Sequence, residues 1–128
     1  MNAVSVVEWI LGCLGSVLIL VGALMDLAAA ILMLRFPNFY LRLHALTVGT
    51  IGGAIVPIIG AALIAISAPW LGQFRWYMAG SSIIVAASMF ILGATGSHTL
   101  ARAVHRSRIV EVYPKIVDHL EEDEGKLE

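Results

Sequence analysis

Charged residues are scarce in this chain of 128 residues. Asp, Glu, Lys and Arg make up 13% of it, against roughly 25% in a typical soluble domain. The formal net charge is −1, so the basic excess that nucleic-acid binding requires is missing. The single cysteine, Cys13, excludes an internal disulfide and a multi-cysteine metal cage. No Lys or Arg precedes Trp9, so we do not expect the first apolar segment to be a signal peptide.

Motifs for enzyme chemistry are missing as well. The glycines from Gly49 to Gly53 are not followed by the Lys-Ser/Thr pair of a P-loop. The sequence contains no His/Glu pair at zinc-ligand spacing and no nucleophile triad. We therefore expect no enzymatic activity, no resident metal ion and no cofactor.

Hydrophobic residues, in contrast, make up 59% of the chain, which is more apolar surface than a domain of this size can bury alone. They concentrate in residues 9–34, 45–68 and 77–101, and each segment exceeds the roughly 20 residues that a helix needs to cross a bilayer. The pattern predicts an all-α membrane protein. Three transmembrane helices form one domain, residues 1–101, and a charged tail follows, residues 102–128.

The distribution of arginines predicts the orientation of these helices. Five arginines lie in the first loop and at the start of the tail, whereas the opposite side has only Arg75. Because positive residues favour the cytoplasmic side, we expect the N-terminus outside and the tail in the cytoplasm. Within the tail, apolar residues at helical spacing from Ile109 to Leu120 predict a short helix before an acidic run.

Small residues recur along one face of each predicted helix. Membrane helices associate through close backbone approach and interhelical hydrogen bonds, because lipid supplies no hydrophobic drive between them. The faces therefore predict packing against other membrane subunits, or only closure of the three-helix bundle itself. Pro57 lies beside the second face and predicts a kink there. The faces comprise Gly15 and Gly22 in the first helix, Gly49, Gly53 and Gly60 in the second, and Gly80, Ala87 and Ala94 in the third.

Of all residues in the three segments, Asp26 has the highest free-energy cost of insertion into the membrane. It lies eight positions before Leu34, roughly 12 Å from the end of its helix and near the middle of the bilayer. An ionised carboxylate there costs about 2.5–3.5 kcal/mol on insertion scales. Such a residue either takes up a proton or a cation, or fastens its helix to a partner. Weaker candidates for an ion path lie on the third helix, namely Ser88, Thr95 and His98.

The most specific segment joins the first two helices, residues 34–45. Pro37 is expected to stop the first helix, and the rest of the segment to form a short cytoplasmic hairpin. The segment resembles the G-type small subunit of the Mrp-type multisubunit cation/proton antiporters, and the resemblance covers about residues 10–100. Two positions differ from the family's usual residues, since Asn38 replaces an acid and Val48 a lysine, and Asp26 lies outside the family pattern. The resemblance rests on Arg35-Phe36-Pro37, Tyr40 and Arg42-Leu43-His44-Ala45, followed by a glycine-rich helix.

The resemblance implies a small multi-pass subunit of the bacterial plasma membrane. The complex would exchange Na+, or another monovalent cation, for protons, and its other membrane subunits would be the partners. We expect the hairpin to dock on those subunits through Arg35, Pro37, Tyr40, Arg42 and His44. Two other functions stay open: a self-sufficient homo-oligomeric channel or carrier with Asp26 lining its pore, and a pure assembly scaffold.

Overall fold

The computed structural model describes residues 3–108, and nearly all of them are helical. The predicted tail helix lies outside these residues. A π-helix joins two α-helices end to end, so residues 39–66 form one continuous rod, named here the middle helix. The elements are α1 (Ala3–Arg35), α2 (Phe39–Val48), the π-helix η1 (Gly49–Ile55), α3 (Val56–Ile66), the 3₁₀ turn η2 (Pro69–Leu71) and α4 (Phe74–Ser107).

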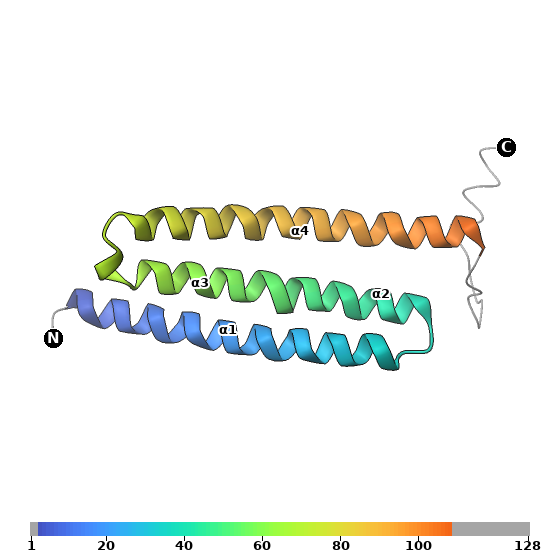
Figure 1. Ribbon diagram of the computed structural model, residues 1–128, viewed down its shortest axis with the longest axis horizontal. Coiled ribbons are helices and arrows are strands. Elements are labelled where there is room, and N and C mark those ends of the chain that lie inside the picture. The colour runs from blue at the N-terminus through green and yellow to red at the C-terminus, as the bar shows by residue number, and fades with distance from the viewer. Residues whose placement is uncertain (1–2, 109–128) are drawn as a thin grey trace.

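The three long helices lie side by side in a single layer (Figure 1). The middle helix packs against α1 on one side and α4 on the other, and α1 makes no extensive contact with α4. The start of α1 and the η2 turn share one end of the layer, and the ends of α1 and α4 share the other (Figure 1). Both broad faces of the layer are therefore left open by the described part of the chain.

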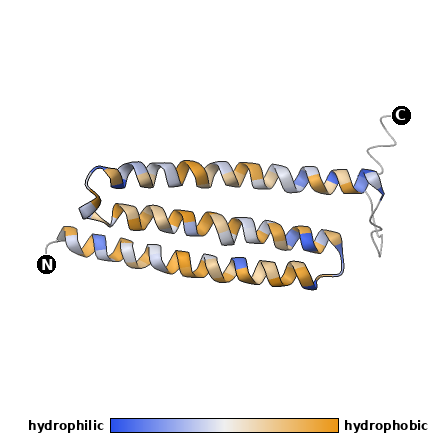
Figure 2. Ribbon diagram, in the orientation of Figure 1, coloured by the Kyte–Doolittle hydropathy of each residue, from blue (hydrophilic) through white to orange (hydrophobic). Residues whose placement is uncertain are grey.

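The structure confirms an all-α fold with three helices that are long and apolar enough to cross a membrane: Val4–Arg35, Phe39–Ile66 and Phe74–Ser107. Hydrophobic residues run along the length of each helix, while hydrophilic residues gather toward the ends and turns (Figure 2). Apart from Ile55, the buried residues are alanines and glycines, so backbones approach closely while large side chains such as Leu24 and Ile91 point outward.

The turn between α1 and α2 is shorter than the predicted hairpin. Only residues 36–38 are non-helical, and α2 already begins at Phe39, six residues before the predicted start of the second span. Pro37 restricts the residue before it to extended conformations, so α1 ends at Arg35. Asn38 has an extended backbone, and no residue after it opposes helix formation. Three residues are therefore enough to reverse the chain.

The middle helix contains an irregularity where the sequence predicted a kink. Residues Gly49–Ile55 form a π-helix, and Val56 donates its N–H to the carbonyl of Ile51, five residues earlier. Pro57 follows directly and has no N–H to give to the carbonyl of Gly53, four residues before it. In a π-helix each N–H reaches the carbonyl five residues before it, so the bond that Pro57 cannot make is the one to Gly52, whose carbonyl faces Gly22 of α1 instead.

Candidate functional site

Glycines form the contact between α1 and the middle helix. A methyl group on Gly60 would lie 2.6 Å from the carbonyl oxygen of Gly15, and a methyl group on Gly15 would lie 2.6 Å from the carbonyl oxygen of Gly60. Further along, Gly22 faces the ring of Pro57 and the carbonyl of Gly52. Because backbone atoms cannot move aside as a flexible side chain can, these positions admit only glycine without a shift of the helices.

Asp26 lies against the π-helix at the next step along this contact. A methyl group on Gly53 would lie 2.6 Å from the Cβ of Asp26 and 2.8 Å from its Oδ1. Gly49 packs in the same way against Ala29, and a methyl group on Gly49 would lie 3.8 Å from the Oδ1 of Asp26. The missing side chains at positions 49 and 53 therefore create the space that the carboxylate occupies. Gly53 lies about halfway along the middle helix, so this contact is near mid-membrane.

A groove of about 280 Å³ opens beside Asp26 on one face of the layer. Thr50 also lines it, and its hydroxyl donates to the carbonyl of Leu46 at 3.0 Å, which leaves the lone pairs of the hydroxyl oxygen available. All three long helices contribute to the groove, because it reaches from α1 across the middle helix to Met89 of α4. The lining residues are Asp26, Ala29, Ala30, Met33, Leu46, Gly49, Thr50, Ala54 and Met89.

The Asp26 carboxylate has no hydrogen-bond donor and no basic partner among residues 3–108. It therefore does not fasten α1 to the other helices of this chain through an ion pair. Carboxylate and hydroxyl oxygens are ligands that suit hard cations, and a carboxylate can also take up a proton. Among the described residues, no three His, Cys, Asp or Glu side chains cluster as metal ligands.

The other three ion-path candidates lie away from this groove. Exposed side chains on α4 include Ser88, Thr95 and His98, but the α4 residue that lines the groove is Met89. The hydroxyls of Ser88 and Thr95 donate to the carbonyls of Ile84 and Ile91, one turn back in the same helix. The structure thus does not bring these side chains together with Asp26.

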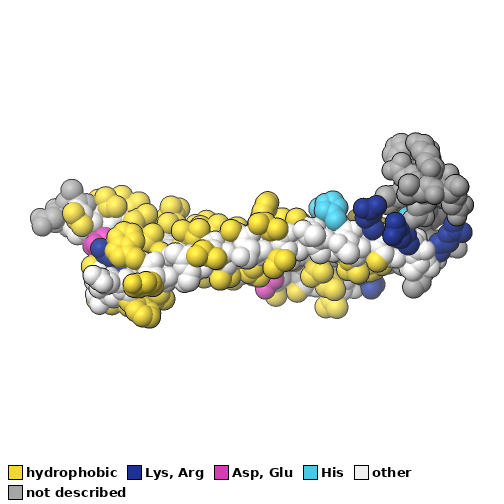
Figure 3. Space-filling model, turned by 90° about the horizontal axis from the view of Figure 1, so that it is seen from above, with side chains coloured by type: hydrophobic (Ala, Val, Ile, Leu, Met, Phe, Trp, Pro, Cys, Tyr) yellow, Lys and Arg dark blue, Asp and Glu magenta, His cyan; other side chains and the backbone are white. Residues whose placement is uncertain are grey.

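The turn residues form a compact end to the layer. Arg42 donates from Nε to the carbonyl of Phe36 at 2.7 Å, just past the end of α1, where a cation complements the helix dipole. The rings of Phe39 and Tyr40 meet edge to face, with centroids 5.8 Å apart. Arg35, Pro37 and His44 are exposed. Arginine side chains gather at this end of the molecule, close to the end of α4 (Figure 3).

Sequence reasoning identified Asp26 and the glycines but missed the π-helix and Thr50. The signal available was a proline four residues after Gly53, within a glycine-rich stretch. That pattern predicts an irregular helix without specifying its form, because a helix that lacks the proline N–H can contain either a kink or a π-helical turn. Thr50 became a site residue only through the groove that the three helices enclose.

Known proteins are similar to this chain in sequence, and one solved structure is similar to it in fold. Residues 18–105 match the model of the PhaG/MnhG/YufB family, described as Na+/H+ antiporter subunit. The chain is 27% identical over 124 residues to the UPF0091 protein PH1455 of Pyrococcus horikoshii, an alignment that covers 91% of this chain and 97% of that protein. A chain in the structure of the Mrp complex from Dietzia sp. DQ12-45-1b has a TM-score of 0.71 at 30% identity, and the match covers 92% of this chain and 96% of that chain.

Proposed function

This chain belongs to the family of Na+/H+ antiporter subunits, and from that premise we propose that Asp26 binds a transported ion on the ion route of the antiporter. The chain is a G-type small subunit of the Mrp antiporters. It is a small multi-pass protein of the plasma membrane, and its partners are the other membrane subunits of the antiporter. The family is one of transporters rather than enzymes, and we extend this to the chain itself, which has no catalytic role.

One observation carries the proposal: Asp26 lies unpartnered within residues 3–108, near mid-membrane, in a groove that the π-helix borders. A carboxylate in this position needs a proton, a cation or a basic group from a neighbour to offset its desolvation. In a Na+/H+ antiporter the first two are the transported species. Asp26 and Thr50 together offer oxygen ligands on the same groove. The groove is open to one side, so the route runs between this chain and a neighbouring subunit.

Asp26→Asn in the complete antiporter tests this proposal. The amide has the same shape but can neither ionise nor take up the proton, so we expect Na+-dependent proton movement to fall at least about tenfold. The measurement is a transmembrane pH assay in everted vesicles, with the amount of each subunit determined in the same membranes. Asp26→Glu retains the carboxylate and should retain much of the activity. Ser82→Ala is the control, because it removes a hydroxyl that is bonded to the carbonyl of Met78 on its own helix.

The outcomes separate the remaining functions. Full transport by Asp26→Asn at normal subunit levels would remove Asp26 from the ion route and favour a pure scaffold. Loss of the complex from the membrane would identify Asp26 as an assembly contact with a basic residue of a neighbour. The unmodified chain, reconstituted alone in liposomes, should move no ions, and flux from it would favour the homo-oligomeric channel instead.

A further inference from the structure

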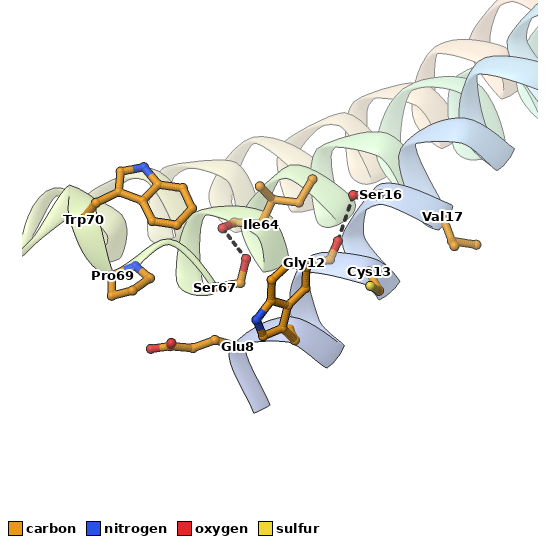
Figure 4. Close-up of a pocket in the computed structure, with 10 residues that line it drawn as sticks. Glu8, Gly12, Cys13, Ser16, Val17, Ile64, Ser67, Pro69 and Trp70 are labelled. Atoms are coloured by element: carbon orange, nitrogen blue, oxygen red, sulfur yellow. Dashed lines mark hydrogen bonds between the residues drawn. The ribbon is translucent and has the colours of Figure 1, made fainter. Parts of the chain in front are cut away.

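A second and larger groove, of about 760 Å³, lies at the opposite end of α1 from the Asp26 groove. It runs along α1 from Glu8 to Val17, roughly 14 Å, and its other wall is the end of α3 with the η2 turn (Figure 4). The lining residues are Glu8, Trp9, Gly12, Cys13, Ser16, Val17, Ile64, Ser67, Pro69 and Trp70. Neither the glycine contact nor the ion route uses this groove.

The inner part of the groove suits hydrocarbon. The hydroxyl of Ser16 donates to the carbonyl of Gly12, and that of Ser67 to the carbonyl of Ile64, each at 2.8 Å (Figure 4). Both hydroxyl protons are therefore used within their own helices. Gly12 lets the two walls meet at the floor of the groove, because a methyl group there would lie only 3.2 Å from the Oγ of Ser67. A groove of this kind at membrane level is filled by apolar chains.

The end of the groove toward the start of α1 has a different chemistry. Glu8 is half-buried and forms no ion pair with any residue that the structure describes. Trp9 and Trp70 are 71% and 82% exposed, and they stand on the two walls beside it. Indole faces attract organic cations, and tryptophan is typical of the membrane–water interface. Glu8, Trp9 and Trp70 line the same groove, so its outer end offers an organic ammonium group both a carboxylate and indole faces.

We propose that this groove binds one phospholipid whose headgroup carries a primary amine, of the phosphatidylethanolamine class. An acyl chain lies along Gly12 and Ile64, and the ammonium group pairs with Glu8 at the end of the groove that Trp9 and Trp70 also line. The same site disfavours a lipid with only a phosphate and hydroxyls, because that lipid brings negative charge to Glu8 without a cation to offset it. Glu8 supplies the headgroup selectivity, and Gly12 supplies the space for the chain.

Native mass spectrometry of the purified antiporter complex tests the site. The probes are dioleoyl phosphatidylethanolamine and dioleoyl phosphatidylglycerol, which share their chains and differ in the headgroup. We expect the complex to bind the amine lipid more tightly. Glu8→Gln should weaken the binding of that lipid roughly tenfold and leave the binding of the other lipid unchanged. Gly12→Leu should abolish binding of both by filling the groove. Gly96→Leu is the matched control, because a side chain there meets no atom within 4 Å and Gly96 belongs to none of the small-residue faces.

A photo-crosslinking residue in place of Cys13, on the wall of the groove, identifies the occupant directly. A lipid adduct on this chain supports the proposal. An adduct with another subunit overturns it, since a partner helix then fills the groove. Equal affinity for the two lipids, unaltered by Glu8→Gln, also overturns it, because any acyl chain would then suffice.

Discussion

Gly60 and Gly15 show how single residues hold this protein together, since each leaves the room that the backbone carbonyl of the other needs. We predict that Gly60→Ala destabilises the assembled subunit by about 1–3 kcal/mol, the usual range for overpacking. Gly96→Ala should be neutral or slightly stabilising, because a methyl group there meets no atom within 4 Å and alanine favours helix. Melting temperatures of the purified complexes compare the two variants, and equal values would contradict this account of the α1 contact.

Residue patterns predicted the packing face of α1 more directly than that of α4. In α1 the residues at the predicted seven-residue spacing, Gly15, Gly22 and Ala29, are all buried. In α4 two adjacent registers repeat every seven residues. The structure buries Ala79 and Ala86, whereas Gly80 and Ala87 of the predicted face are exposed. Spacing alone could not choose between them, because both offer equally small side chains and the choice depends on the partner helix.

At the scale of elements, Gly22 and Pro57 form a complementary pair between α1 and α3. The proline ring fills the space that a side chain on Gly22 would occupy. We predict that Gly22→Ala alone is destabilising through overlap with the ring, and that Pro57→Ala alone is destabilising through the void it leaves. The double variant should lose less stability than the sum of the two, because the added methyl group occupies part of the void.

A double-mutant cycle on the melting temperature of the complex measures this coupling. A coupling of about 0.5–3 kcal/mol is typical of residues in contact. Strict additivity would mean that the proline matters for the π-helix alone and not for packing on α1. Thr47→Val serves as a control, since Thr47 is not part of this pair and its hydroxyl bonds to the carbonyl of Leu43.

The elements themselves were largely predictable, whereas their irregularities were not. Lipid requires about 20 apolar residues in a row, so hydropathy locates each span with little ambiguity. The start of α2 at Phe39 was missed because Arg42 and His44 read as loop residues, although Arg42 in fact bonds back to the carbonyl of Phe36 from within the helix. The π-helix at Gly49–Ile55 was missed because the glycines and Pro57 predict an irregular helix there without specifying its hydrogen-bond pattern.

For the whole molecule, the single-layer arrangement explains why so much of its apolar surface is exposed. Large side chains cover both outer sides of α1 and α4, and the described residues bury no polar or charged side chain. The membrane or neighbouring subunits must cover this surface, because apolar side chains are unfavourable in contact with water. The Asp26 groove has the same character, since three helices form its floor and walls but leave one side open.

The orientation of this layer follows from its charges. Arg35, Arg42 and the arginines at the end of α4 lie at one end, while Arg75, held over the ring of Trp76 at 5.0 Å, lies at the other. Positive residues are retained on the cytoplasmic side during insertion. We therefore predict that the turn at residues 36–38 faces the cytoplasm, and that the turn before α4 faces outward.

Single cysteines in a Cys13→Ser background test this orientation. Asn38→Cys and Gln73→Cys place thiols at opposite ends of the layer, and neither native side chain caps its helix, so the exchange removes no hydrogen bond of that kind. A membrane-impermeant maleimide should label Gln73→Cys in intact cells and Asn38→Cys only after permeabilisation. The reverse labelling would invert the topology, and would place the arginine-rich end, with its exposed Arg35 and His44, on the outer surface.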